Sequence, residues 1–464
     1  MPLFGTRGAA SVTGFGGLAK LGYLLRNSLR FRSSASAYLN RTPAGVGNRT
    51  TFTWSGWVKR GTLGTLQYMF CAGSSSGTAA LTWTTSDTLE FYDYQAPSTI
   101  FDLVTSQVFR DPAAWYHIVA VYDSTQASSS NRVKLYVNGV QITAFGTASY
   151  PSQNANSLFN TTIPHTHFGR YTGSSYTDFN SDAYLAEVNF VDGQALTPSS
   201  FGKTDAATNQ WVPKKFGGAY GTNGFYLPFT NTASTSTLGN DFSGNSNTWT
   251  VNNISLTSGS TYDSMKDVPT LTDADTANYS TYNPLAKGGN CSFSNANLQY
   301  DFSSGSANLG HATIGVTSGK WYYEVQPTAS TGGSGVNFLA GWHSQSPDYI
   351  NYGTYYWDAG GYGGINFGIE KSSGTNTGVV STGFAQNDIC GIALDYDGGT
   401  IEYFKNGSSI GKTTGMTING AILFPTIGVW TPSYTATTVV NFGQRPFAYT
   451  PPSGFKALNT FNLP

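Results

Sequence analysis

The chain has 464 residues, of which 15% are aromatic and only 11% are Asp, Glu, Lys or Arg, whereas about 25% charged residues is usual for globular domains. The net charge is −1, so the chain has no excess of the basic residues that recognise phosphates. We therefore expect no nucleic-acid partner. The apolar runs fall short of the roughly 18 residues of a membrane span, so we also expect no membrane insertion.

The N-terminal segment, residues 1–26, is rich in glycine and has only scattered apolar positions. It lacks the continuous apolar stretch of a secretory signal. We interpret it as a flexible docking arm that precedes the first domain.

Residues 27–203 are predicted to form one all-β module. Apolar and polar residues alternate with a period of two, most clearly in 115–123 and 133–137, which indicates strands buried on one face. Asn138 and Gly139 follow directly, and this pair favours a tight hairpin because both positions tolerate positive φ.

Residues 204–284 differ from the segments on either side. They contain many turn residues and only brief apolar runs, with one short predicted strand near 224–229. They are too aromatic for a free linker, so we expect this connector to lie against one of the modules.

Residues 285–464 return to the alternating pattern, and Asn406-Gly407 predicts a second tight turn between two strands. A long helical pattern is found nowhere in the sequence. The predicted fold class is therefore all-β, with two β-sandwich modules joined by an irregular connector.

The second half resembles the SPRY family. Residues 319–325 are GKWYYEV and residues 388–411 are DICGIALDYDGGTIEYFKNGSSIG, followed in the family's order by LFPTIGV and VVNFGQRPF. The resemblance implies a bent sandwich of two antiparallel sheets. It also implies binding of proteins or other ligands through loops at one edge, without catalytic residues.

The first half resembles the laminin G-like, or concanavalin A-like, jelly rolls. The segments that carry the resemblance are TFTWSGWVKR, AAWYHIVAVYD, VKLYVNGV and AEVNFVDGQALTPSSF. Members of this group bind sugars or proteins, and some relatives hydrolyse glycans, so the resemblance implies a binding module.

The connector is similar to segments that recur in bacteriophage tail and fibre proteins, for example in QWVPKKFGGAYGTNGFYLPF. This similarity implies a location in the virion, where the N-terminal arm would dock on other virion proteins. By analogy with fibres, it also implies a homo-oligomer, with a trimer as the expected state.

Exposed aromatic rings beside amides and carboxylates are the side chains that we expect to contact sugars. The densest stretch holds Tyr349, Tyr352, Tyr355, Tyr356, Trp357, Asp358 and Tyr362. The first module offers two smaller sets, which are Tyr92, Asp93 and Tyr94, and Arg170, Tyr171 and Tyr176. Each set either binds a ligand or packs against the sandwich or another subunit, and the residues alone leave both possibilities open.

The sequence predicts no enzyme, no metal site and no cofactor. A retaining glycan hydrolase needs two carboxylates about 5–5.5 Å apart, whereas Glu90 and Glu187 lie on distant segments of the first module. His165 and His167 have no third ligand nearby in the sequence, the three cysteines are widely spaced, and no P-loop is present.

These observations favour a phage virion appendage, a tail or head fibre, that binds host-surface glycans through loops of its sandwiches. One alternative is a capsid decoration or a tail or baseplate component with no receptor role. A glycan hydrolase is a less favoured third possibility.

Overall fold

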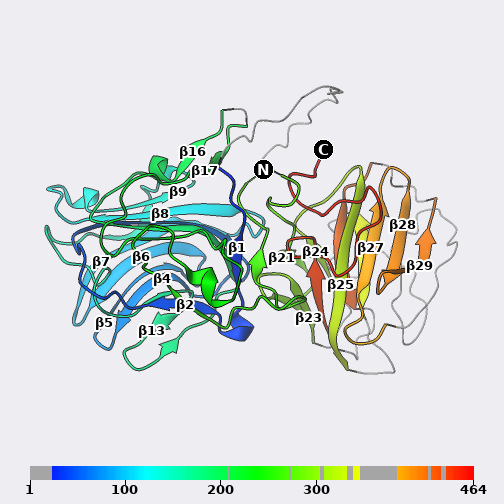
Figure 1. The fold of residues 1–464 in the computed structure, drawn as a ribbon, viewed down its shortest axis with the longest axis horizontal. Coiled ribbons are helices and arrows are strands. Elements are labelled where there is room, and N and C mark those ends of the chain that lie inside the picture. Colours follow the sequence, from blue (N-terminus) through cyan, green and yellow to red (C-terminus); the bar gives the residue numbers. More distant parts are fainter. Residues whose placement is uncertain are drawn as a thin grey trace.

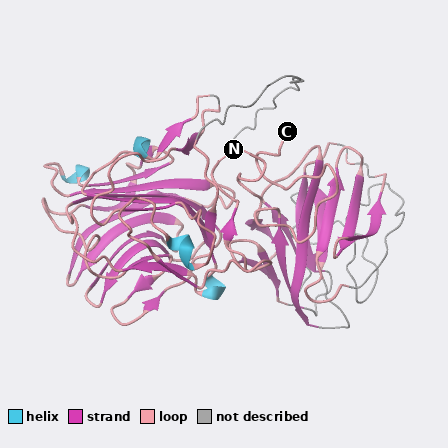
Figure 2. Cartoon of the chain, in the orientation of Figure 1, coloured by secondary structure: helices cyan, strands magenta, loops and turns pink. Residues whose placement is uncertain are grey.

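We describe the protein from a computed structural model. It describes residues 23–206, 208–270, 273–303, 308–331, 338–344, 384–415, 418, 420–429 and 435–464. Within these residues the regular structure consists of β-strands and four short 3-10 helices, as Figure 2 shows. The 3-10 helices are η1 (Ser33–Ala35), η2 (Ser129–Asn131), η3 (Pro198–Ser200) and η4 (Ser236–Gly239). The predicted all-β fold class with two sandwich modules is confirmed. Most of the predicted arm, residues 1–22, lies outside the described residues.

The first module is a sandwich of two antiparallel sheets, which form the left lobe of Figure 1. Sheet I runs in the order β10 (Val140–Gln141), β9 (Val133–Val137), β8 (Trp115–Asp123), β3 (Thr51–Arg60), β15 (Ala183–Asp192), β1 (Ser28–Phe31) and β20 (Ser264–Met265), and β18 (Phe225–Leu227) also pairs with β15. Sheet II runs in the order β11 (Phe145–Ser149), β7 (Ser98–Val108), β6 (Thr88–Gln95), β5 (Gly77–Trp83), β4 (Gln67–Ser74), β12 (His165–His167), β2 (Tyr38–Arg41) and β19 (Thr250–Asn252).

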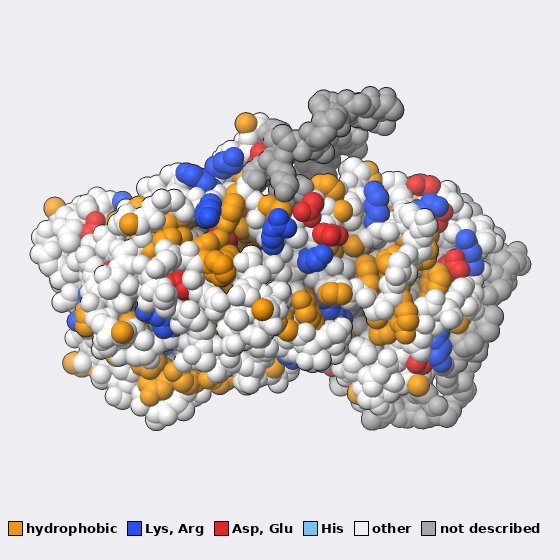
Figure 3. Space-filling model, viewed as in Figure 1, with side chains coloured by type: hydrophobic (Ala, Val, Ile, Leu, Met, Phe, Trp, Pro, Cys, Tyr) orange, Lys and Arg blue, Asp and Glu red, His pale blue; other side chains and the backbone are white. Residues whose placement is uncertain are grey.

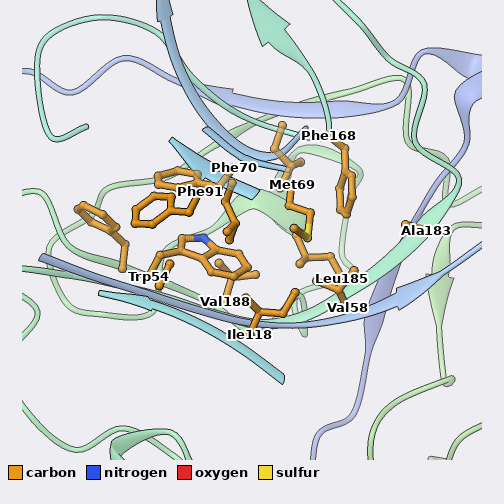
Figure 4. Packing of buried hydrophobic residues seen from close by; sticks show 14 of the residues in the cluster. Trp54, Val58, Met69, Phe70, Phe91, Ile118, Phe168, Ala183, Leu185 and Val188 are labelled. Carbon is orange, nitrogen blue, oxygen red and sulfur yellow. The ribbon is translucent and has the colours of Figure 1, made fainter. Parts of the chain in front are cut away.

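The core between sheets I and II combines aromatic rings with aliphatic side chains (Figure 4). Trp54 of sheet I stacks on Phe70 of sheet II with 6.1 Å between ring centroids, and Phe70 stacks on Phe159 at 4.8 Å. Each ring removes about 150–250 Å² from water, so a few such residues hold the sheets together. The hairpin predicted at Asn138-Gly139 joins β9 to β10, with φ values of 50° and 82°.

The connector supplies strands to both sheets of the first module. β18 and β20 extend sheet I, and β19 extends sheet II beside β2. A separate two-stranded hairpin is formed by β16 (Gly202–Thr204) and β17 (Trp211–Pro213). The connector therefore completes the first sandwich instead of hanging between two modules.

The second module also consists of two antiparallel sheets, which form the right lobe of Figure 1. Sheet III runs in the order β21 (Tyr282–Lys287), β24 (Asn308–Ala312), β30 (Leu423–Val429) and β26 (Leu339–Ser344). Sheet IV runs in the order β22 (Cys291–Ser294), β23 (Gln299–Phe302), β31 (Thr435–Asn441), β25 (Lys320–Thr331), β27 (Cys390–Asp395), β28 (Thr400–Lys405) and β29 (Ser408–Thr413). The turn predicted at Asn406-Gly407 joins β28 to β29, with φ values of 49° and 80°.

The two modules share one continuous hydrophobic core at their seam. Trp57, Trp115 and Tyr184, from the outer face of sheet I, belong to the same buried cluster as Trp321 and Tyr323 of the second module. A side-chain hydrogen bond crosses the seam from the Tyr184 hydroxyl to the carbonyl of Ala296, at 3.0 Å.

A buried ion pair lies inside this seam. The Lys59 ammonium on β3 is 2.8 Å from the Asp267 carboxylate of the connector, and both side chains are fully buried. Lys59 also donates to the Asn278 side chain and to the carbonyl of Tyr279, so all three of its donor protons are used. The other oxygen of Asp267 accepts hydrogen bonds from the Trp115 indole and from the backbone N–H of Tyr279.

We predict that Lys59→Met destabilises the protein by about 3–5 kcal/mol, because it leaves the Asp267 carboxylate buried without a counter-charge. Lys266→Met is the matched control, since its pair with Asp275 spans 3.4 Å between side chains that are 43% and 80% exposed. The control should cost less than about 1 kcal/mol. Urea unfolding of both variants measures the difference, and equal losses would contradict a structural role for the buried pair.

Candidate functional site

The two outer faces of the first module differ in what covers them. On sheet I, Phe201 and, from the connector, Phe216 and Tyr220 cover Val119 and Val121. Trp57 and Trp115 on the same face lie against the second module. The outer face of sheet II instead carries the short hairpin of β13 (Arg170–Tyr171) and β14 (Tyr176–Thr177), with several partly exposed rings. Sheet II therefore offers the surface on which a ligand could lie.

We call this surface the aromatic face. It consists of Tyr38, Tyr68, Tyr92, Tyr171, Tyr176 and Phe179. The strand register shows how the sheet arranges it. Direct Cα partners run across five neighbouring strand pairs, in the order Asn40, Thr166, Cys71, Ala80, Tyr92 and Asp102. Residues that are directly opposite on paired strands point to the same side of a sheet, so these six side chains share the outer face.

The rings on the β13–β14 hairpin hold one another in place. The ring centroids of Tyr171 and Tyr176 lie 5.0 Å apart. The ring centroid of Tyr38 lies 5.2 Å from that of Tyr176 and 4.8 Å from that of Phe179. The Asn40 side-chain amide donates to the Tyr176 hydroxyl at 3.0 Å. These contacts fix the orientation of rings that remain partly exposed.

The hairpin can lie on sheet II because glycine occupies position 73 of β4. A Cβ atom at this position would stand 2.1 Å from the backbone oxygen of Tyr171. Any other residue would push β13 away from the sheet, so Gly73 is required for this close approach.

Arg170 places a cation beside these rings. Its guanidinium lies over the Tyr68 ring at 5.7 Å and donates to the Tyr68 hydroxyl at 3.0 Å. It also lies 3.5 Å from the Asp178 carboxylate, with the Arg170 side chain 34% exposed. The arginine is thus oriented by its neighbours while it keeps part of its surface in solvent.

Two carboxylates lie on the same face of sheet II. The Thr82 hydroxyl donates to Glu90 at 2.8 Å, whereas Oδ1 of Asp102 is buried and accepts no hydrogen bond from any described group. Burial raises the pKa of both carboxyls, and the charge of Asp102 adds to the effect on Glu90. Carboxylates on this face suit a ligand that brings hydroxyl donors.

The structure brings together four of the residues predicted from the sequence, Tyr92, Arg170, Tyr171 and Tyr176, and separates Asp93 from them. Asp93 points the opposite way, is fully buried, and accepts hydrogen bonds from the Ser157 hydroxyl at 2.7 Å and from the N–H of Leu158 at 2.8 Å. Tyr94 is 41% exposed near the end of β6, and because it pairs with Thr78, which pairs with Gly73, it shares the outer face of sheet II with Tyr92. The set in the second module lies outside the described residues, and so it stays a prediction.

Sequence reasoning missed Tyr38, Tyr68, Phe179, Glu90 and Asp102. A partial signal was present, because Leu89, Phe91 and Asp93 alternate with Glu90 and Tyr92. That alternation already assigns Asp93 to the core side of its strand. It does not show that β2, β4 and β6 bring their outward tyrosines to one surface.

Glu90 and Glu187 lie on different sheets, as their distance in the sequence suggested. Glu187 is on β15 of sheet I, where it is buried and accepts a hydrogen bond from the Tyr226 hydroxyl at 2.9 Å. Burial raises its pKa to about 7. The two glutamates therefore do not form a carboxylate pair.

A serine and a histidine are also paired, on the outer side of sheet I. Nε2 of His117 lies 2.9 Å from the Ser55 hydroxyl oxygen, and the Trp211 indole donates to Nδ1 of His117 at 2.9 Å. Because indole N–H can only donate, Nδ1 is the acceptor and Nε2 carries the proton. Nε2 then donates to Ser55, which is opposite to the proton flow that would activate a serine nucleophile.

His165 and His167 are both core residues of β12. Nδ1 of His165 lies 2.8 Å from the carbonyl of Ile163, and Nδ1 of His167 lies 2.9 Å from the carbonyl of Met69. The His167 ring also contacts Trp249 at 4.6 Å. Among the described residues, no group of three or more His, Cys, Asp or Glu side chains could hold a metal ion. The same part of the chain includes no helix long and apolar enough to span a membrane.

Comparison with known families matches both modules. Residues 33–200 match the concanavalin A-like lectin/glucanases superfamily, in its laminin G-like form, and residues 320–445 match the SPRY domain. The chain carries a concanavalin A-like domain and an SPRY domain. The two family resemblances in the sequence are thereby confirmed, while the strands β18, β19 and β20 extend the concanavalin A-like sandwich beyond the matched residues.

Solved structures include similar folds at low identity. The SPRY domain of human HERC1 is 18% identical, with 34% of this chain and 96% of that chain covered and a TM-score of 0.27. Domains LG4-5 of the mouse laminin alpha1 chain are 10% identical, with 97% and 91% covered and a TM-score of 0.30. A SAP-like pentraxin from Limulus polyphemus is 13% identical, with 42% and 95% covered and a TM-score of 0.30.

The burial of His117 in the concanavalin A-like domain leads to a pH prediction. Burial lowers the pKa of His117 to about 3, whereas a histidine in the unfolded chain has a pKa of about 6.5. Between these values the unfolded state binds a proton that the folded state does not, so stability falls as the pH falls. Relative to His117→Gln, the wild type should lose about 2 kcal/mol between pH 7 and pH 5.

Urea unfolding of both proteins at pH 7, 6 and 5 measures this difference. Glutamine keeps one donor and one acceptor for Ser55 and Trp211, so the variant isolates the titration. If the difference in unfolding free energy between the wild type and His117→Gln does not change with pH, His117 is not neutral in the folded protein.

Proposed function

We propose that this protein is a bacteriophage virion appendage, a tail or head fibre component, that binds host-surface glycans through the aromatic face of its concanavalin A-like domain. The observation that carries the binding proposal is the convergence of Tyr92, Tyr171 and Tyr176 on one partly exposed surface. The virion location rests on the similarity of the connector to phage tail and fibre segments. The N-terminal arm would then dock on other virion proteins.

The chemistry of the aromatic face suits a glycan. Sugar rings present C–H faces that stack on aromatic rings, and their hydroxyls both donate and accept. Arg170 supplies donors, and Glu90 and Asp102 supply acceptors. Each polar or apolar group of a neutral, hydroxyl-rich ligand would therefore find a complementary group on the aromatic face.

The rings are also arranged before a ligand arrives. Tyr176 contacts Tyr38 and Tyr171 and accepts a hydrogen bond from Asn40. A side chain that is already held loses little conformational entropy on binding. Tyrosine is suited to such surfaces because it offers a large rigid area with few rotatable bonds.

The remaining surface is consistent with a protein exposed outside a cell. Figure 3 shows a face on which charged and hydrophobic side chains are scattered among backbone and uncharged polar groups. This matches the low charged fraction of 11%. A coat of hydroxyls and amides supports solubility without strong non-specific electrostatic attraction.

We predict that Tyr171→Ala/Tyr176→Ala weakens glycan binding about fivefold or more, because each lost ring contact is worth about 0.5–1.5 kcal/mol. Phe461→Ala is the control, since Phe461 is 40% exposed at the far end of the chain. Binding of the full-length protein to host cells and to a glycan array measures the effect, with thermal unfolding to confirm that both variants are folded.

A parallel variant, Tyr355→Ala/Tyr356→Ala, tests the residues predicted from the second half. Loss of binding in this variant alone would place the binding site in the SPRY domain and contradict the proposal that the aromatic face binds the glycan. Absence of host and glycan binding by the wild type, together with normal adsorption of virions that lack the protein, would overturn the receptor role.

A structural role in the virion is the second candidate, as a capsid decoration or a tail or baseplate component. The continuous core at the seam favours it, because two modules joined in this way behave as one rigid piece. Locating the protein in a reconstruction of the virion distinguishes the two functions. A projecting position favours attachment to the host, and a position flat on the shell favours cementing. Release of reducing sugar from host glycans would instead support the third possibility, a glycan hydrolase.

A further inference from the structure

Lys59 reaches the seam from β3, a central strand of sheet I. It is the direct Cα partner of Trp115 on β8 and of Tyr184 on β15, so these three side chains share the outer face of the sheet. The lysine is fully buried, and its ammonium lies 5.8 Å from the centroid of the Tyr184 ring. Such surroundings favour the unprotonated amine, which is the form that can attack a carbonyl group.

The side-chain amide of Asn278 lies directly against this amine. Oδ1 of Asn278 is 2.8 Å from Nζ of Lys59, and Nδ2 of Asn278 donates to the carbonyl of Ala113 at 2.8 Å. Both contacts agree on which end of the amide is the oxygen, so the carbonyl end faces the lysine. The carbonyl carbon is bonded to that oxygen, and it therefore lies within reach of Nζ.

Asp267 supplies an acid–base group at the same point. Its Oδ2 lies 2.8 Å from Nζ of Lys59, and its side chain is fully buried. Burial lowers the pKa of Lys59 and raises the pKa of Asp267. Both shifts ease the transfer of a proton from the ammonium to the carboxylate, which leaves a neutral amine beside the Asn278 carbonyl.

Backbone contacts hold these side chains in place. Asp267 and Ala277 form a parallel bridge, and the N–H of Val268 donates to the carbonyl of Ala277 at 2.9 Å. The backbone carbonyl of Asn278 accepts a hydrogen bond from the N–H of Thr460, also at 2.9 Å. Groups that are fixed within reach of each other react as if at effective concentrations of up to about 10⁵–10⁸ M.

We propose that Lys59 and Asn278 form an intramolecular isopeptide bond, with Asp267 as the acid–base group. The Lys59 ammonium gives one proton to Asp267, and the lone pair of Nζ attacks Cγ of Asn278. The bond between Cγ and Nδ2 then breaks, and Nδ2 takes up a second proton from Nζ through the Asp267 carboxyl and leaves as ammonia. The products are one secondary amide, one ammonia and a protonated Asp267, so atoms and charge balance.

The bond would cross-link two distant parts of the chain. Lys59 and Asn278 are 219 residues apart, and Asn278 comes shortly before β21, the first strand of sheet III. Cross-linking such a long loop restricts the unfolded chain, as a disulfide does. It would also replace a buried ion pair with a neutral amide and a neutral carboxyl, which removes the cost of two buried charges.

The mass of the full-length protein tests the proposal. Under denaturing conditions, we expect the wild type to be lighter than its sequence by one ammonia after overnight incubation at neutral pH. Trypsin cannot cleave after a lysine whose amine is acylated. Digestion should therefore yield one branched peptide, in which residues 50–60 are joined to residues 267–287.

Lys59→Arg and Asn278→Ala should both have the full mass of their sequences, because each lacks one of the two reacting groups. Asp267→Asn keeps both groups and should slow the reaction at least about a hundredfold, since it removes the acid–base group. Lys320→Arg is the matched control. Lys320 pairs with Asp395 at 2.9 Å, but its side chain is 47% exposed, so this variant should still lose ammonia at the wild-type rate.

A succinimide at an Asn-Gly pair, such as Asn138-Gly139, would also release one ammonia. It would remain in Lys59→Arg and would give no branched peptide, so the two products are distinguishable. A wild type at its full sequence mass, a mass deficit that persists in Lys59→Arg, or loss of water with a link from Lys59 to Asp267 would each overturn the proposal. The wild-type measurements decide the outcome even if the variants fail to fold.

Discussion

The buried pair of Lys59 and Asp267 is the interaction on which the arrangement of this protein depends. Lys59 stands on β3, in the middle of sheet I, whereas Asp267 belongs to the connector more than two hundred residues later in the chain. The ammonium uses its three protons on three acceptors, and the carboxylate is satisfied by Lys59, Trp115 and Tyr279. Such a pair tolerates burial only because every lone pair and proton near it has a partner.

This constraint decides which surfaces remain available. Once Asp267 and the following residues are fixed against β3, the second module covers the outer face of sheet I around Trp57 and Trp115. Sheet II lies on the other side of the sandwich, beyond the aromatic core of Trp54 and Phe70. The rings of the aromatic face therefore remain where a ligand can reach them, because the opposite face serves the seam.

The seam holds further buried charges besides this pair. Arg30 and Arg32 share the Asp263 carboxylate, and Glu324 accepts hydrogen bonds from the backbone N–H groups of Ala448 and Tyr449. Buried charge is expensive unless it is paired or hydrogen-bonded, so these contacts help to fix the connector and the C-terminal segment in place.

The sequence by itself determined the all-β class, the two families and the tight turns at Asn138-Gly139 and Asn406-Gly407, because a period of two and the tolerance of positive φ are local properties. It also contained the inward direction of Asp93, through its alternation with Tyr92. Only the tertiary structure decided that Tyr38, Tyr92 and Tyr176 share one surface, that the connector completes the first sandwich, and that Arg30 and Arg32 pair with Asp263. Alternation assigns a side chain to a face of its own strand. The partner strand is selected by long-range register and packing, which no local pattern records.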